Sequence, residues 1–252
     1  MSESRTALKD RSFGATFRRD NWWLEPLPVI IIMGGFGLYA TLRAFQGTNY
    51  EWGPYLSPFY SPLIDPEHHW WPLSPAVLIL GIPLGFRTTC YYYRKAYYRS
   101  FFMSPPACAV TGTSGRSYSG ERKFPFILQN LHRYFLYLSL LFIFILAYDA
   151  VKAYFFADGF GVGIGSLVMT VNVVLLACYT LSCHSLRHLV GGKLDCFSCA
   201  VAGNTRYKAW RGVSILNERH MLWAWMSLFS VGLTDLYIML VAQGTITDLR
   251  LF

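Results

Sequence analysis

Charged residues are scarce in this chain, because Asp, Glu, Lys and Arg make up only 14% of its 252 residues. A soluble globular domain carries about 25%, so the composition excludes an ordinary soluble protein. Hydrophobic residues reach 54% and aromatic residues 17%. Such a composition is typical of a polytopic membrane protein, whose apolar segments face lipid.

Acidic residues are fewer than basic ones, 14 against 22, which gives a formal net charge of +8. The basic residues are unevenly placed: five precede residue 20, six lie in 94–123 and six in 187–219, whereas 47–74 has none. Basic loops stay in the cytoplasm under the positive-inside rule. The pattern predicts a cytoplasmic N-terminus and a basic cytoplasmic face for an acidic partner, and it does not indicate nucleic-acid binding.

Five apolar runs are each long enough to cross a bilayer, which takes about 20 helical residues. They are residues 27–46, 75–98, 124–156, 161–189 and 213–242. The third and fourth are longer than the bilayer needs, so we expect them to tilt or to project into water. No cleavable signal peptide is expected at the start. The predicted fold is all-α: a single transmembrane domain over residues 1–252, with five transmembrane helices, four of which form a cofactor-binding bundle.

Two parts of the chain carry the same sparse pattern of polar residues within apolar sequence. The first has Cys90 and Arg94 four residues apart, followed by His132. The second has Cys183, Arg187 and His220 in the corresponding places. Leucines four residues before each histidine and a later Ser-Leu pair extend the match. The repeat indicates a diverged duplication that relates four helices by a pseudo-twofold axis.

The two cysteines and two histidines of this repeat are candidate metal ligands. Each lies about nine residues from a basic residue on the cytoplasmic side, which places all four roughly 13–15 Å into the helices. Residues at one depth on different helices are how bundles build cofactor sites. Placing an ionisable side chain in a bilayer costs free energy, so the presence of such residues in the spans indicates a function. Arg94 and Arg187, one turn after the cysteines, can supply positive potential to a thiolate.

Three cofactors are compatible with these residues. A Rieske-like [2Fe–2S] cluster would use Cys90, Cys183, His132 and His220, and its two imidazoles would lower the negative charge placed in the membrane. Haem b would use the two histidines alone. A zinc or iron–sulfur site at the cytoplasmic surface would use a separate local set, namely His184, His188, Cys196 and Cys199. Against each stands the plain alternative that a buried cysteine is a small apolar residue.

The remaining cysteines and polar residues of the spans allow weaker predictions. Thiols stay reduced in the cytoplasm, so we expect no disulfides, and Cys108 and Cys178 are interpreted as packing residues. Asp149 and Asp235 either pair between helices or serve a redox substrate. A quinone headgroup could bind among aromatic and basic side chains at the membrane depth of the candidate metal ligands. A belt of aromatic residues at the membrane interface would explain the same residues. These candidates are Arg87, Tyr91, Arg94, Tyr134 and Trp223.

Four long blocks carry a family resemblance: FRTTCYYYRKAYYR, LQNLHRYF, CHSLRHLVGGKLDCFSC and LNERHMLWAWMSLF. With them the chain resembles the membrane-anchor subunit of actinobacterial succinate dehydrogenases, and more distantly the single-chain anchors of succinate:quinone oxidoreductases. The resemblance implies a multi-pass protein of the bacterial cytoplasmic membrane. It also implies a flavoprotein partner with FAD, a partner with iron–sulfur clusters, and quinone as the electron acceptor.

The chain departs from that family pattern at the cofactor. Five-helix anchors of this kind commonly hold two b haems by four histidines on helices, whereas here two central positions are Cys90 and Cys183. His132 and His220 are left without obvious histidine partners, so a Rieske-like cluster is the favoured prediction and haem b the alternative. A hypothesis of another class is a non-redox membrane scaffold or transporter.

Overall fold

The computed structural model describes residues 12–64, 72–113, 122–124, 126–192 and 194–252. Five basic residues on which the predicted orientation partly depends lie outside these ranges, namely Arg5, Lys9, Arg11, Arg116 and Lys193. Contacts divide the chain into two compact units. The first unit is Met1–Thr41 with Arg87–Leu131, and the second is Leu42–Phe86 with His132–Phe252. The predicted single domain over residues 1–252 stays a prediction.

The first unit contains most of the long apolar helix α2 and one short helix rich in tyrosine. Its elements are η1 (Trp22–Leu24), α2 (Leu27–Gln46, whose last turn belongs to the second unit), α4 (Tyr91–Ser100) and η2 (Phe126–Leu131). The segment before η1 is attached to the loop after α4 by a bridge between Thr16 and Val110. Arg18 pairs there with Asp20 and Glu25.

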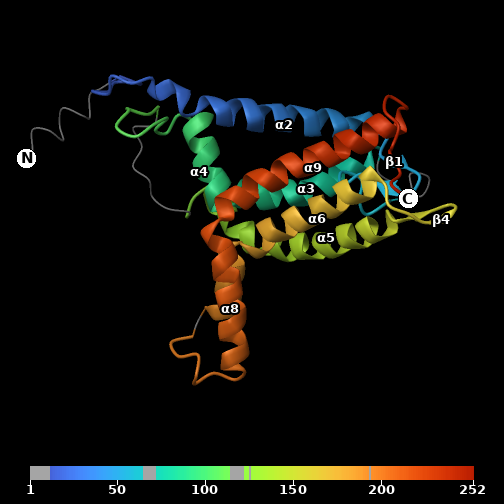
Figure 1. The fold of residues 1–252 in the computed structure, drawn as a ribbon. Helices are drawn as coiled ribbons and strands as arrows, with labels where there is room; N and C mark the ends of the chain where they lie inside the picture. The colour runs from blue at the N-terminus through green and yellow to red at the C-terminus, as the bar shows by residue number, and fades with distance from the viewer. Residues whose placement is uncertain (1–11, 65–71, 114–121, 125, 193) are drawn as a thin grey trace, which may run out of the picture. The chain divides into compact units, whose positions relative to one another are not determined.

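The second unit is a helical bundle with two short hairpins. Its helices are α3 (Pro75–Thr89, up to Phe86), α5 (His132–Lys152), α6 (Ile164–Leu181), α7 (His184–Gly191), α8 (Gly203–Glu218) and α9 (His220–Ala242). The hairpins are β1 (Glu51–Trp52) with β2 (Tyr55–Leu56) and β3 (Phe155–Phe156) with β4 (Gly159–Phe160), both antiparallel. Helix α6 runs between α5 and α9, and α8 leaves the bundle steeply (Figure 1).

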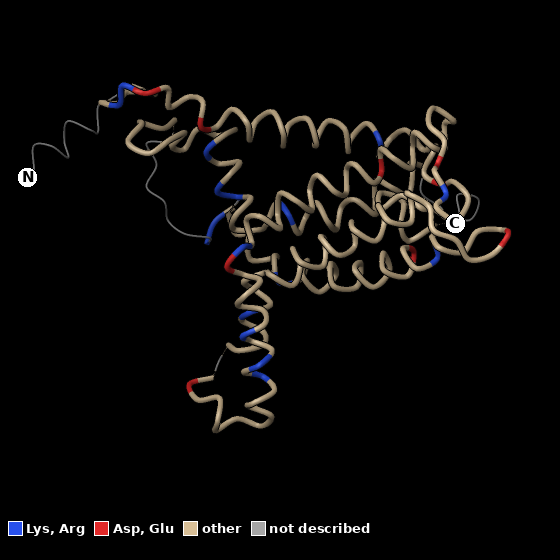
Figure 2. Tube along the Cα trace, in the orientation of Figure 1, with Lys and Arg blue, Asp and Glu red and all other residues tan. Residues whose placement is uncertain are grey.

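The membrane class predicted from composition is confirmed. In the described residues, four helical segments are long and apolar enough to cross a bilayer: Trp22–Gln46, Phe126–Lys152, Ile164–Leu181 and His220–Ala242. Lys and Arg residues are frequent along α8 and rare along α5, α6 and α9 (Figure 2). The second predicted span, 75–98, is not confirmed, because its helix α3 has only 15 residues.

Several predicted span boundaries are wrong because the helices change direction within apolar sequence. The run 75–98 divides at Cys90, the run 161–189 divides at Ser182 and Cys183, and 213–242 divides at Arg219. The run 124–156 begins as a 3-10 helix, and its α-helix ends at Lys152. Hydropathy measures transfer into lipid and carries no information about helix direction, so these breaks are invisible to it.

Asp235 of α9 makes a buried ion pair with Arg43 at the end of α2. The Arg43 Nε to Asp235 Oδ2 distance is 2.8 Å, and the two side chains are 2% and 0% exposed. Ser57 also donates to Asp235, and Ser61 donates to Asp149 of α5. Both carboxylates therefore attach the segment 47–64 to membrane helices. Asp235 pairs between helices, as the sequence allowed, whereas Asp149 binds a loop residue.

The C-terminal segment is attached at the same end of the second unit by Asp248. This carboxylate accepts hydrogen bonds from Tyr55, Tyr237 and the backbone N–H of Gly165. Burial, and then the hydrogen bond to Asp248, raises the pKa of Tyr55 to about 12. The ends of α6 and α9 are thus tied to the loop that follows α2.

Candidate cofactor site

Cys90 and Cys183 occupy the same local structure. Each follows an apolar helix and is the N-cap of a short helix, with φ −64° and ψ 131° at Cys90 and φ −63° and ψ 134° at Cys183. Each backbone N–H donates to the carbonyl three residues earlier, at 3.2 Å and 3.3 Å. Both side chains are buried, at 3% and 2% exposed. The sequence repeat is therefore also a repeat of backbone conformation.

His132 and His220 are equivalent in the same way. His132 is the first residue of α5 and follows η2, whereas His220 is the first residue of α9 and follows α8. All four candidate ligands consequently lie at the N-terminal ends of helices. The positive end of the helix dipole makes such positions favourable for negative charge.

Three of the four candidate ligands come together in the second unit. His132 Nε2 lies 3.2 Å from Cys183 Sγ. His220 Nδ1 lies 2.7 Å from the hydroxyl of Ser182, the residue before Cys183. Cys90, the fourth, belongs to the first unit. A contact between imidazole and thiol thus joins α5 to the break between α6 and α7, and the His220 ring of α9 contacts the residue before that thiol.

Two aromatic rings hold the histidines in place. His132 stacks on Phe86 with ring centroids 4.8 Å apart and an interplanar angle of 1°. His220 stacks on Tyr179 at 5.2 Å, and Tyr179 meets Phe86 edge to face at 5.4 Å. Both aromatic residues are buried, so the imidazole planes are fixed by packing as well as by hydrogen bonds.

Ser182 determines which nitrogen of His220 is available to a metal. Its hydroxyl lies 2.9 Å from the carbonyl oxygen of Tyr179 and 2.7 Å from His220 Nδ1. A hydroxyl has one proton to donate. The Ser182 hydroxyl, the Tyr179 carbonyl and the His220 ring all form hydrogen bonds when Ser182 donates to Tyr179 and accepts from a protonated Nδ1. In that tautomer the lone pair of the His220 ring is on Nε2. Such hydrogen bonds to the second ring nitrogen are what orient metal-bound histidines.

Phe86, Tyr179 and Ser182 were not among the residues predicted from the sequence. The repeat nevertheless contains a signal for them, because an aromatic residue lies four positions before each cysteine: Phe86 before Cys90 and Tyr179 before Cys183. A hydroxyl residue also directly precedes each cysteine, as Thr89 and Ser182. These positions were overlooked because aromatic and hydroxyl residues are common in membrane helices.

The alternative metal set is only partly assembled. The rings of His184 and His188 lie 4.8 Å apart on successive turns of α7. Cys196 and Cys199, however, are joined in a disulfide, so the expectation of reduced thiols is wrong there; their Cα atoms are 5.4 Å apart, within the usual range for a disulfide. Among the described residues, no group of three or more His, Cys, Asp or Glu side chains is arranged to hold a metal ion.

The two cysteines interpreted as packing residues differ. Cys178 on α6 is half-buried, but Cys108 is exposed, so that interpretation is wrong for Cys108. Arg99 donates to its sulfur at 3.3 Å. Cys108 lies in the loop after α4, which places its sulfur at the surface. The residue type alone does not show whether a cysteine is buried or exposed.

The predicted quinone residues are divided between the units. In the first unit, Arg87 donates to the Tyr93 hydroxyl, and the Arg94 guanidinium lies 4.9 Å from the centre of the exposed Tyr91 ring. In the second unit, Tyr134 is 66% exposed. The indole Nε1 of Trp223 is buried and has no hydrogen-bond partner within the described part of the chain. These five residues stay a prediction.

Comparison with known proteins agrees with the resemblance seen in the sequence. A family model described as actinobacterial succinate dehydrogenase subunit SdhC matches residues 24–244. A chain of a solved structure, the Mycobacterium smegmatis Sdh1 complex in the apo form, is 47% identical, and the match covers 94% of each chain with a TM-score of 0.83. No curated protein matches. The chain belongs to the actinobacterial family of succinate dehydrogenase membrane subunits, SdhC.

Proposed function

We propose that this subunit passes electrons from the iron–sulfur subunit of succinate dehydrogenase to quinone in the membrane. Its partners would be that subunit and the FAD-containing flavoprotein, as the family membership and the likeness to a chain of the Sdh1 complex support. The observation that carries the proposal is the contact of 3.2 Å between His132 Nε2 and Cys183 Sγ inside a membrane bundle.

We further propose that Cys90, Cys183, His132 and His220 hold a Rieske-like [2Fe–2S] cluster. The donor set fits that group, because Rieske centres combine two cysteine and two histidine ligands. When bound, such a cluster supplies reversible one-electron transfer. Cys90 and Cys183 each cap the N-terminus of a short helix, where the helix dipole favours negative charge. Two neutral imidazoles would limit the negative charge within the membrane.

The residues around the histidines favour this cluster over haem b. A haem held by His132 and His220 needs an open porphyrin face at the Nε2 atom of each ring. His132 Nε2 instead faces the thiol of Cys183. Phe86 and Tyr179 stack on the two imidazoles and touch each other, so porphyrin binding would require both buried rings to move.

Paramagnetic resonance of the purified, reduced complex tests the proposal. We expect a Rieske-type signal that is lost in Cys90→Ser and in Cys183→Ser. Cys178→Ser is the matched control, because Cys178 also lies in the membrane bundle but outside the repeat. Copurification of the flavoprotein shows that each variant still assembles.

The competing functions give different results. Split cytochrome absorption bands that persist in both cysteine variants would establish haem b in place of the cluster. A His132→Ala/His220→Ala double variant that assembles and still reduces quinone at the normal rate would instead support a non-redox scaffold or transporter.

A further inference from the structure

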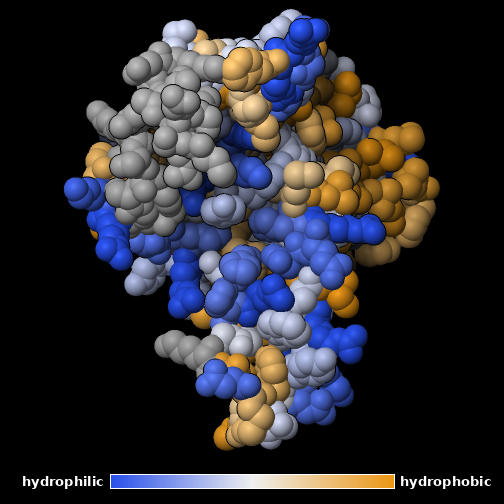
Figure 3. All heavy atoms as spheres, turned by 90° about the vertical axis from the view of Figure 1, so that its left-hand side faces the viewer, coloured by the Kyte–Doolittle hydropathy of each residue, from blue (hydrophilic) through white to orange (hydrophobic). Residues whose placement is uncertain are grey.

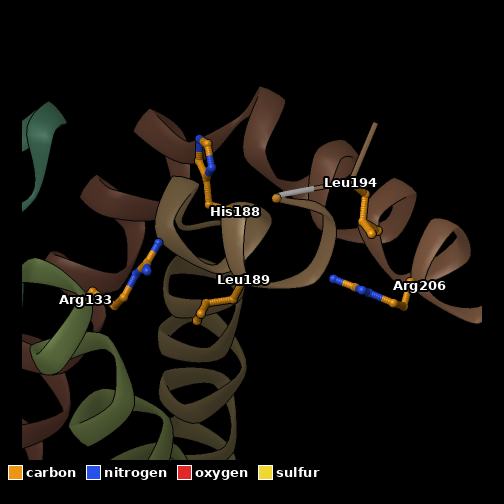
Figure 4. A pocket seen from close by; sticks show the side chains of 6 residues that line it. Arg133, His188, Leu189, Leu194 and Arg206 are labelled. Atoms are coloured by element: carbon orange, nitrogen blue, oxygen red, sulfur yellow. The ribbon is translucent and has the colours of Figure 1, made fainter. Parts of the chain in front are cut away.

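A pocket of about 440 Å³ opens where α5, α7 and α8 meet in the second unit. It is lined by Arg133, His188, Leu189, Gly192, Leu194 and Arg206. Arg133 is in the first turn of α5, and Arg206 is in the first turn of α8. Figure 4 shows the two guanidinium groups directed toward the turn of Leu189 from opposite sides. The pocket is separate from the group formed by His132, Cys183 and His220.

The pocket is built to receive negative charge. None of its six lining residues is acidic, and neither arginine forms an ion pair within the described parts of the chain. Arg206 Nε donates to the carbonyl oxygen of Val190 at 3.1 Å. That bond uses one edge of the guanidinium and holds its terminal nitrogens in place. Planar guanidinium groups bind phosphate oxygens through paired hydrogen bonds.

An apolar surface continues from the pocket along α5. Tyr137, Leu141, Phe144 and Tyr148 follow Arg133 at helical spacing, and each is at least 47% exposed. Residues with this spacing share one face of a helix. Helix α8 carries Arg206, Lys208 and Arg211, and the lower part of Figure 3 shows hydrophilic side chains mixed with apolar ones. A ligand in the pocket therefore has water on one side and a membrane-facing apolar stripe on the other.

We propose that this pocket binds the phosphate headgroup of an anionic phospholipid, whose acyl chains lie along the exposed face of α5. A basic pocket between membrane helices on the cytoplasmic side is a recurring headgroup site. The continuous apolar stripe favours a lipid over a free phosphate, because a soluble anion makes no use of it. The bound lipid would join α5 to α7 and α8.

Native mass spectrometry of the whole complex tests the proposal. The complex is placed in nanodiscs of phosphatidylcholine with a minor fraction of phosphatidylglycerol, and retained lipid is measured after transfer to detergent. We expect retained phosphatidylglycerol, with binding weakened about fivefold by Arg133→Gln or Arg206→Gln and about 30-fold by both. The control is Lys208→Gln/Arg211→Gln, which removes two exposed charges from α8 outside the pocket.

Other outcomes would overturn the proposal. An equal loss of phosphatidylglycerol in the control would show that binding depends on surface charge in general. Undiminished binding in the pocket variants would show that the pocket is not the lipid site. Displacement of the lipid by excess inorganic phosphate would show a site for free anions. The paramagnetic signal of the complex is expected to be unchanged in all these variants, so this test is independent of the proposed electron transfer.

Discussion

Replacing Ser182 by alanine tests how the candidate cofactor site is held. The change removes the hydroxyl that lies 2.7 Å from His220 Nδ1. Ser182 is 0% exposed, so water does not readily replace the lost oxygen. A buried N–H left without a partner costs about 1–3 kcal/mol. Loss of an outer-shell partner typically weakens metal binding about 10- to 100-fold, which agrees with that range.

With the proposed cluster bound, the expected result of Ser182→Ala is that the cluster is still present but is held less firmly. Nδ1 of His220 no longer has a defined acceptor, so the imidazole rotates more freely and its tautomer is no longer selected. We expect shifted paramagnetic g-values and a signal lost about 10- to 100-fold more readily to an iron chelator. The assay is the reduced complex followed by paramagnetic resonance against chelator concentration, together with a redox titration.

Ser166→Ala is the matched control for this experiment. Ser166 is also on α6 and also 0% exposed, and its hydroxyl makes two hydrogen bonds at the other end of the helix, to Ala153 and Gly163. It should reduce stability without changing the signal. If Ser182→Ala left the g-values, the potential and the chelator sensitivity at the wild-type values, Ser182 would not be the residue that orients His220.

Two further changes test the packing of the second unit. Asp235→Ala leaves the buried Arg43 without its carboxylate and should lower stability by about 3–5 kcal/mol; a thermal unfolding scan of the complex measures it, and an undiminished midpoint would contradict the ion pair's role. Gly191→Ala places a Cβ 2.3 Å from the Trp210 ring and should cost about 1–3 kcal/mol, seen as faster hydrogen exchange in α7 and α8. Gly212→Ala, with nothing within 4 Å of its Cβ, should leave that exchange unchanged or slower.

The class of the protein could be predicted from composition because transfer into a bilayer depends on residue type summed over a segment. Helices α2, α5, α6 and α9 are predominantly apolar, and each was anticipated. The helix breaks at Cys90 and Cys183 were not anticipated. A helix break hardly changes the mean hydropathy of a segment. Whether a break forms depends on which neighbouring side chains can bind the backbone groups that it leaves without helical hydrogen bonds.

The ligand types and their repeat were also visible in the sequence, since cysteine and histidine are rare and their spacing can be compared directly. Their surroundings were not. Phe86 and Tyr179 stack on histidines that are far away in sequence, and the partner of Asp235 is Arg43, 192 residues away.

The sequence by itself determined that this chain is a helical membrane protein of the succinate dehydrogenase family and which residue types could bind a metal. Tertiary structure alone decided that His132 meets Cys183 and that Ser182 faces His220. The physical reason is that composition and periodicity act within one segment, whereas contacts depend on how segments pack against one another.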